Sequence, residues 1–221
     1  MTNKHTPMQS DPTSPQGTAR LVFGEIELII QTPNDLDALL DTAAEHAPDD
    51  VDAIPYYAIL WPAAHGLATY LHQRANEVRG HTLIELGCGL ALPSILSSRL
   101  GAQVTATDFH ADTSPWVVQN AQNNGAELSF KQLDWNAFLR PQGPRRSQHD
   151  FVVGSDLLYE AKHIPALICA IDSLCAAHGE AIIADPGRNN LPIFCSGMEK
   201  LGWRYELIPI DEIFVCRFQR T

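Results

Sequence analysis

The chain has 221 residues, of which 45% are hydrophobic and 19% charged, and its formal net charge is −11. This length and composition predict one globular domain with a continuous hydrophobic core. The acidic balance argues against a nucleic-acid-binding protein, because broad contact with phosphates needs clustered Lys and Arg, and only Arg145 and Arg146 form such a pair.

The five cysteines are scattered and form no C-x-x-C pair, so the sequence predicts reduced thiols and no metal site. Residues 1–20 lack the apolar core of a signal peptide, and no apolar run is long enough to span a membrane. We therefore expect a cytoplasmic protein that makes no contact with membranes.

The N-terminal segments precede the main pattern of the chain. Residues 1–20 are rich in Pro, Ser, Thr and Gln, which predicts a flexible tail. Residues 21–31 have strand composition, and residues 34–47 begin with a capping Asn and continue at helical spacing. We expect residues 21–60 to form a small extension of one domain whose core covers residues 61–221.

Farther along the chain, short apolar runs alternate with segments of helix length. The expected strands are 82–86, 103–108, 127–134, 149–156 and 180–185. The expected helices are 63–78, 92–101, 112–125, 162–179 and 191–202. Residues 203–210 and 212–218 have alternating apolar positions around an Asp-Glu pair, which predicts an antiparallel hairpin. The pattern predicts an α/β fold in which helices cover both faces of a mostly parallel sheet.

The stretch ELGCGLA, residues 85–91, follows the first strand of that sheet. Gly87 and Gly89 allow the backbone to turn sharply and to approach a ligand, since they carry no Cβ. The third glycine of a dinucleotide motif is missing, because Leu92 occupies its position. A tight structural turn without a ligand is the alternative interpretation.

Two carboxylates indicate which ligand this turn binds. Asp108 ends the next strand about 20 residues after the glycines, as expected for an acceptor of ribose hydroxyl groups. Glu85 precedes the turn, where a carboxylate would repel a pyrophosphate but suit a ligand with a sulfonium and an ammonium group. These residues favour S-adenosylmethionine over NAD or FAD.

Five motifs together resemble the class I, seven-strand methyltransferases: ILWPAAHGLATYL, LIELGCGLALPSI, VTATD, LDW and GSDLLYE. More narrowly, the chain resembles methyltransferase family 16, which includes protein lysine methyltransferases and predicted nicotinamide N-methyltransferases. The resemblance covers residues 55–218. It implies a three-layer, Rossmann-like sandwich with a seven-stranded sheet that ends in the antiparallel hairpin.

The resemblance also implies residue roles in binding the cofactor. Gly87, Cys88 and Gly89 would line its methionine end, and Asp108 would hold its ribose. Trp135 would lie beside the adenine, and Asp134 would accept a hydrogen bond from the adenine amine. Ser155 would contact the adenosine through its backbone, and Trp61 would close the pocket from the N-terminal side. The alternatives are core packing for the two tryptophans and a helix N-cap for Asp134.

Asp156 and Tyr159 resemble the D-x-x-Y element that faces the methyl-transfer site in this group. Methyl transfer to an amine needs a neutral nucleophile and a clear approach, so positioning dominates the chemistry. Asp156 would orient the amine and Tyr159 would shape its channel, unless Asp156 caps the next helix and Tyr159 packs beneath it. The sequence SDLLY also differs from the [D/N]-P-P-[Y/F] motif of base-flipping DNA methyltransferases.

Two further positions leave alternatives open. Arg188, in ADPGR, is either a contact to the substrate or a solvated residue of a Pro-Gly turn. Ala91 replaces a glycine that methyltransferases often have, and we expect a helical conformation to tolerate its methyl group.

The sequence therefore predicts a monomeric, S-adenosylmethionine-dependent N-methyltransferase whose acceptor is a lysine of another protein. One alternative is methyl transfer to a small amine such as nicotinamide. Another is a module that binds the cofactor without catalysing transfer.

Overall fold

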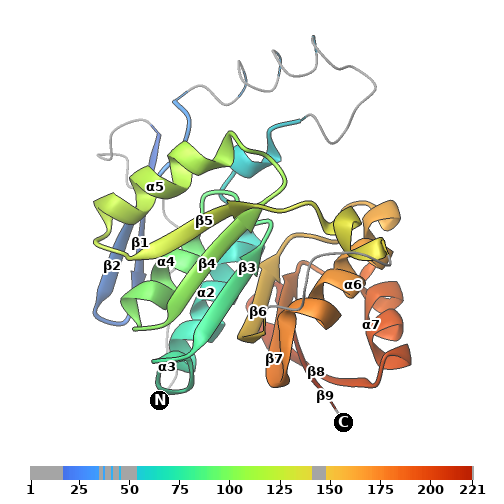
Figure 1. The fold of residues 1–221 in the computed structure, drawn as a ribbon. Helices are drawn as coiled ribbons and strands as arrows, with labels where there is room; N and C mark the ends of the chain where they lie inside the picture. The colour runs from blue at the N-terminus through green and yellow to red at the C-terminus, as the bar shows by residue number, and fades with distance from the viewer. Residues whose placement is uncertain are drawn as a thin grey trace.

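The computed structural model describes residues 17–34, 54–140 and 148–220, together with residues 37, 41 and 45. Most of the predicted helix over residues 34–47 and most of the predicted tail lie outside the described residues; residues 37, 41 and 45 are helical. Figure 1 shows a central sheet with helices on both faces, and a separate two-stranded hairpin beside α5.

The central sheet has seven strands in the order β5-β4-β3-β6-β7-β9-β8. Its strands are β3 (Thr82–Leu86), β4 (Gln103–Asp108), β5 (Leu128–Gln132), β6 (His149–Ser155), β7 (Cys175–Asp185), β8 (Trp203–Ile210) and β9 (Ile213–Arg220). β3 to β7 pair in parallel, and β9 lies antiparallel between β7 and β8. The predicted α/β class and the C-terminal antiparallel hairpin are confirmed.

Alternation along the strands separates the two helical layers. In β7, Ile183 packs into a cluster with α6 (Ile164–Leu174) and α7 (Leu191–Lys200), whereas its neighbour Ile182 packs against α2 (Pro62–Gln73) on the other face. α4 (Leu92–Arg99) and α5 (Thr113–Asn123) contribute to a third cluster. Because strands inside an α/β sheet are covered on both faces, the central residues 151–153 of β6 and 181–184 of β7 form continuous apolar runs.

The N-terminal hairpin is part of this packing. β1 (Thr18–Phe23) and β2 (Ile26–Gln31) turn at Gly24, and their inward side chains join the cluster around α4. Asn120 and Asn124 of α5 donate to and accept from the backbone of Gln31 and Ile29, so side-chain amides occupy an edge of β2. The hairpin therefore covers α5 without extending the main sheet.

Three predicted boundaries are wrong. The predicted tail overlaps β1, because Thr18–Phe23 already pairs with β2. The helix predicted over 63–78 ends at Gln73, and α3 (Ala75–Val78) follows as a separate turn. The helix predicted over 162–179 consists of η4 (Ala161–His163) and α6, since β7 begins at Cys175. Pairing of Cys175 with His149 on β6 outweighs the helical periodicity there.

The strand order reverses between β4 and β6, which lie on opposite sides of β3. The carboxyl ends of these strands and of β7 share one rim because the strands are parallel. Two short helices, η2 (Tyr56–Ala58) and η3 (Trp135–Leu139), supply further residues to the same rim. A ligand site is expected at such a switch point.

Candidate active site

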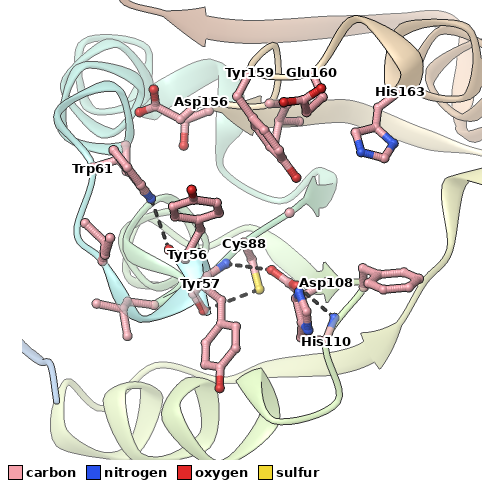
Figure 2. Close-up of a pocket in the computed structure, with 18 of the residues that line it drawn as sticks. Tyr56, Tyr57, Trp61, Cys88, Asp108, His110, Asp156, Tyr159, Glu160 and His163 are labelled. Carbon is pink, nitrogen blue, oxygen red and sulfur yellow. Dashed lines mark hydrogen bonds between the residues drawn. The ribbon is translucent and has the colours of Figure 1, made fainter. Parts of the chain in front are cut away.

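A cavity of about 360 Å³ opens at this rim. Its volume lies in the usual range for small-molecule sites. All but one of the residues predicted to form the site line it: Trp61, Gly87, Cys88, Gly89, Asp108, Asp134, Trp135, Ser155, Asp156 and Tyr159. Figure 2 shows that Asp108 and Asp156 approach the cavity from different elements.

The turn after β3 requires glycine at two positions. Gly87 and Gly89 have φ values of 59° and 48°, which are strained for residues with a Cβ. A Cβ on Gly87 would also lie 2.6 Å from Cδ2 of Leu157, and one on Gly89 would lie 3.0 Å from the carbonyl oxygen of Tyr57. The turn therefore brings its backbone to the cavity wall.

Ala91 differs from the expected helical conformation. Its φ and ψ are 61° and 30°, in the left-handed region, and it forms the N-cap of α4. Glycine is favoured at such a position because an L-residue has a steric cost there. The expectation that Ala91 is accommodated as an ordinary helical residue is wrong.

Asp108 is fixed at the end of β4. Its Oδ2 accepts a hydrogen bond from the backbone N–H of Gly89 at 3.0 Å, and its Oδ1 accepts one from His110 at 3.0 Å. Burial raises the pKa of this carboxyl, and the bonds from Gly89 and His110 oppose the rise. Each oxygen keeps lone-pair capacity for a ligand hydroxyl.

Glu85 is the predicted site residue that does not line the cavity. Strand alternation places it beneath α4, where it is fully buried and its Oε2 accepts from the backbone N–H of Ser94 at 3.0 Å. Burial raises the pKa of Glu85 to about 8. The argument that its negative charge selects the ligand is therefore wrong; Glu85 supports the first turn of α4 from inside the protein.

Trp135 and Asp134 follow β5. A Cβ on Gly87 would lie 3.5 Å from Cζ2 of Trp135, so the indole lies against the turn. Trp135 also packs on the cluster of α6 and α7, so it both lines the cavity and packs against the core. Oδ1 of Asp134 accepts from the backbone N–H of Asn136 at 2.8 Å, which makes Asp134 the N-cap of η3. The N-cap interpretation of Asp134 is confirmed, although the residue also lines the cavity.

Cys88 and Ser155 line the cavity with small side chains. Cys88 is buried and burial raises the pKa of its thiol well above its usual value, so it is a neutral packing group. Ser155 ends β6 and is nearly buried at the cavity edge.

Asp156 bridges three segments. Its Oδ1 forms an ion pair with Nη1 of Arg188 at 2.6 Å, and its Oδ2 accepts from the backbone N–H of Ala63 in α2 at 3.2 Å. The alternative that Asp156 caps the helix after it is wrong, because it bonds to the N-terminus of α2 instead. Its φ of 60° places it in the left-handed region, and its backbone N–H donates to the carbonyl oxygen of Ala184 at 3.0 Å.

Aromatic rings form the side of the cavity next to Asp156. The centroid of the Tyr56 ring lies 6.1 Å from that of Trp61 and 6.1 Å from that of Tyr159. Nε1 of Trp61 donates to the main-chain carbonyl oxygen of Tyr56 at 3.1 Å, which holds the indole against that turn of the backbone. Tyr159 is 42% exposed, so packing beneath a helix is not its main role. Figure 2 shows Tyr56 between Trp61 and Tyr159.

Sequence reasoning missed several cavity residues. Tyr56, Tyr57, Phe109 and His110 all line it, and the rings of Tyr57 and His110 lie 5.3 Å apart. Two adjacent tyrosines after Pro55 were a signal, since consecutive aromatics outside a periodic element do not follow the spacing of a core-facing helix or strand. Phe109 and His110 directly follow the ribose-acceptor position, so their place at the rim could also have been predicted.

The cavity fits S-adenosylmethionine. Asp108 offers a fixed carboxylate for a diol, Trp135 offers an aromatic face for a base, and the turn at Gly87–Gly89 offers close approach of the backbone. Among the described residues no group of three or more His, Cys, Asp or Glu could hold a metal ion. In that same part of the chain, no helix is long and apolar enough to cross a membrane.

The fold, with this cavity at its switch point, is that of the class I methyltransferases. The Thermus thermophilus 16S rRNA N2 G1207 methyltransferase, solved with AdoMet and guanosine, superposes with a TM-score of 0.68 at 14% identity, over 92% of this chain and 50% of that one. The Synechocystis magnesium protoporphyrin IX methyltransferase with bound SAM gives 0.56 at 15% identity, over 86% and 99%. At these identities the likeness concerns the fold.

The sequence model of the lysine methyltransferase family, methyltransferase family 16, matches residues 53–192. This is more than half of the chain, which therefore belongs to that family. S-adenosylmethionine is its methyl donor, as the residue pattern predicted.

Individual relatives agree with the family match. The chain is 30% identical to protein N-lysine methyltransferase METTL21A of Mus musculus over 58% of its length, and 29% identical to EEF1A lysine methyltransferase 3 of Mus musculus over 59%. The matches cover 59% and 56% of those proteins. The chain thus spans little more than half the length of these curated relatives.

Proposed function

We propose that the protein transfers a methyl group from S-adenosylmethionine to the side-chain amine of a lysine in another protein. The observation that carries the proposal is the position of Asp156, whose carboxylate lines the same cavity as the turn at Gly87–Gly89 and is flanked by the aromatic rings of Tyr56, Trp61 and Tyr159. A carboxylate beside aromatic faces suits a cationic or amine group at the end of an apolar stem.

The chain's residues have distinct roles in this proposal. Asp108 binds the ribose hydroxyls, Trp135 packs on the adenine with Asp134 and Ser155 at its edge, and the backbone of residues 87–89 holds the methionine end. S-adenosylmethionine supplies an electrophilic methyl group on its sulfonium sulfur. Asp156 orients the lysine amine by accepting its hydrogen bond and receives the proton that the amine must lose.

The aromatic rings exclude water and confine the lysine stem. Removal of water strengthens the interaction between the amine and Asp156, because the local dielectric falls. Reaction then depends on the approach of a neutral amine along one line, so positioning supplies most of the rate enhancement.

Purified protein incubated with labelled S-adenosylmethionine and a cell extract tests this proposal. We expect label in at least one protein band, and we expect Asp156→Asn to lose that label. Label only in small molecules would identify the small-amine alternative, and cofactor binding without transfer to any acceptor pool would identify a non-catalytic module. The monomeric state and the cytoplasmic location stay predictions.

A further inference from the structure

Arg188 lies between two carboxylates at the rim. Its Nη1 is 2.6 Å from Oδ1 of Asp156 and 3.0 Å from Oδ2 of Asp185. Asp185 ends β7 with a fully buried side chain, whereas the Arg188 side chain is 27% exposed. Both sequence-based interpretations of Arg188, a substrate contact or a solvated turn residue, miss this arrangement.

The turn after β7 fixes where the guanidinium begins. Oδ1 of Asp185 accepts hydrogen bonds from the backbone N–H of Gly187 at 2.8 Å and of Arg188 at 2.7 Å. Asp185 therefore uses one oxygen to hold the turn and the other to hold the guanidinium. The backbone N–H and the guanidinium of Arg188 thus both bond to the Asp185 carboxylate. These two contacts direct the guanidinium toward Asp156.

The three side chains carry a net charge of −1 when all are ionised, because two carboxylates surround one guanidinium. The other titratable groups of the cavity are Tyr159, Glu160 and His163 after β6, Asp108, His110 and Asp134 at the ends of β4 and β5, Cys88 after β3, and Tyr56 and Tyr57 before α2. α2 itself adds the N–H of Ala63. The remaining negative charge matches one incoming ammonium group.

Burial opposes this charge. It raises the pKa of Asp156, and the contacts from Arg188 and then Ala63 lower it, while Asp185 raises it. An opposite charge at hydrogen-bond distance typically lowers a carboxyl pKa by about 1–3 units. Without Arg188, burial and Asp185 would act on Asp156 with little to balance them.

We propose that Arg188 is a positioning residue for methyl transfer: it holds Asp156 ionised and occupies its Oδ1, so that the lone-pair capacity of Oδ2 receives the acceptor amine. Asp185 anchors Arg188 from behind. This inference rests on the proposed function, since the acceptor amine is part of it.

Two replacements of Arg188 test whether its positive charge is what matters: lysine keeps the charge, and glutamine removes it. Only Nη1 contacts both carboxylates, so a lysine ammonium at that point could donate to both. Arg188→Lys should keep Asp156 ionised, whereas Arg188→Gln should not. Arg204→Gln, at an exposed position of β8, is the matched control.

The direct measurement is the pKa of Asp156, obtained by titrating its carboxyl ¹³C NMR signal in the absence of substrate. The signal is assigned by its loss in Asp156→Asn. We expect Arg188→Gln to raise this pKa by about one unit or more, and we expect Arg188→Lys and Arg204→Gln to leave it within about half a unit. An unchanged pKa in Arg188→Gln would overturn the inference.

The pH profile of kcat/KM provides a second readout. The acid limb should move to higher pH in Arg188→Gln and recover in Arg188→Lys, with the affinity for S-adenosylhomocysteine unchanged. A uniform loss of activity at every pH, without recovery by lysine, would indicate a structural role only. If the unaltered protein transfers no methyl group, the proposed function fails, while the NMR measurement still decides what Arg188 does to Asp156.

Discussion

The donor side of the cavity centres on one backbone turn and the carboxylate bonded to it, whereas the acceptor side is built from side chains of three separate segments. The donor side comprises residues 87–91, which follow β3, and Asp108, which ends the adjacent strand β4 and accepts a hydrogen bond from Gly89. The acceptor side comprises Tyr56 and Trp61 before α2, Asp156 and Tyr159 after β6, and Arg188 after β7. Cofactor binding therefore depends on local geometry, and acceptor binding depends on how the domain packs.

Asp108→Asn tests the donor side and has the largest expected effect on binding. Both oxygens of Asp108 accept from backbone N–H groups, of Gly89 and of His110. An asparagine has only one side-chain oxygen, so its NH₂ group would face one of these N–H donors. Hydrogen bonds to charged groups contribute about 1.5–3 kcal/mol, so the Kd for S-adenosylhomocysteine should rise about 10- to 100-fold. Calorimetry measures this, with the exposed Asp112→Asn as the control; equal affinities of the two variants would contradict the assignment.

Tyr56→Leu tests the acceptor side. Loss of the ring removes a face for the lysine ammonium between Trp61 and Tyr159. A cation–π contact of about 0.5–2 kcal/mol predicts a KM for the protein acceptor about tenfold higher, with the cofactor Kd unchanged. Tyr56→Phe keeps the ring and should behave like the unaltered protein. A change in cofactor affinity would mean that Tyr56 belongs to the donor side.

Glu85→Gln tests the support beneath the donor turn. Burial raises the pKa of Glu85 from its ordinary value near 4.5 to about 8. The unfolded chain loses this proton at lower pH than the folded chain, so the Glu85 contribution to the free energy of unfolding falls between about pH 5 and pH 8. Denaturant unfolding at several pH values measures this. The free energy of unfolding should fall less as pH rises in Glu85→Gln than in the exposed control Glu127→Gln. Parallel curves would show that Glu85 ionises normally.

Ala91→Gly has the smallest expected effect. Glycine removes the cost of the left-handed conformation, about 1 kcal/mol, but also removes one buried methyl group worth about 0.8 kcal/mol. The free energy of unfolding should change by less than about 1 kcal/mol, whereas Ala91→Val should lose more than about 2 kcal/mol. If valine is tolerated as well as glycine, the left-handed conformation is not required.

The same contrast explains what the sequence could predict. The strands β3 and β4, the glycine turn and Asp108 are consecutive in sequence, so spacing and residue type were sufficient to place them. Glu85 was misplaced because spacing alone does not say to which face of a strand a side chain points. The conformation of Ala91 depends on how the turn enters α4, which composition does not reveal.

The acceptor side was only partly predictable. The motif around Asp156 and Tyr159 marked two residues, but the ion pair with Arg188 joins positions 32 residues apart, in the loops after β6 and β7. Tyr56 contacts Tyr159 across about a hundred residues, and no local pattern encodes that meeting. The start of β7 at Cys175 was missed for a related reason, because pairing with β6 decides it.

The most direct test compares binding and transfer in one variant, Asp156→Asn. It keeps the shape of the side chain but removes the charge that the acceptor amine needs. We expect calorimetry with S-adenosylhomocysteine to give a Kd within about twofold of the unaltered protein, while the rate of methyl transfer falls by about 100-fold or more. If affinity and transfer fall together, or if transfer persists, the division of the cavity into a donor side and an acceptor side is wrong.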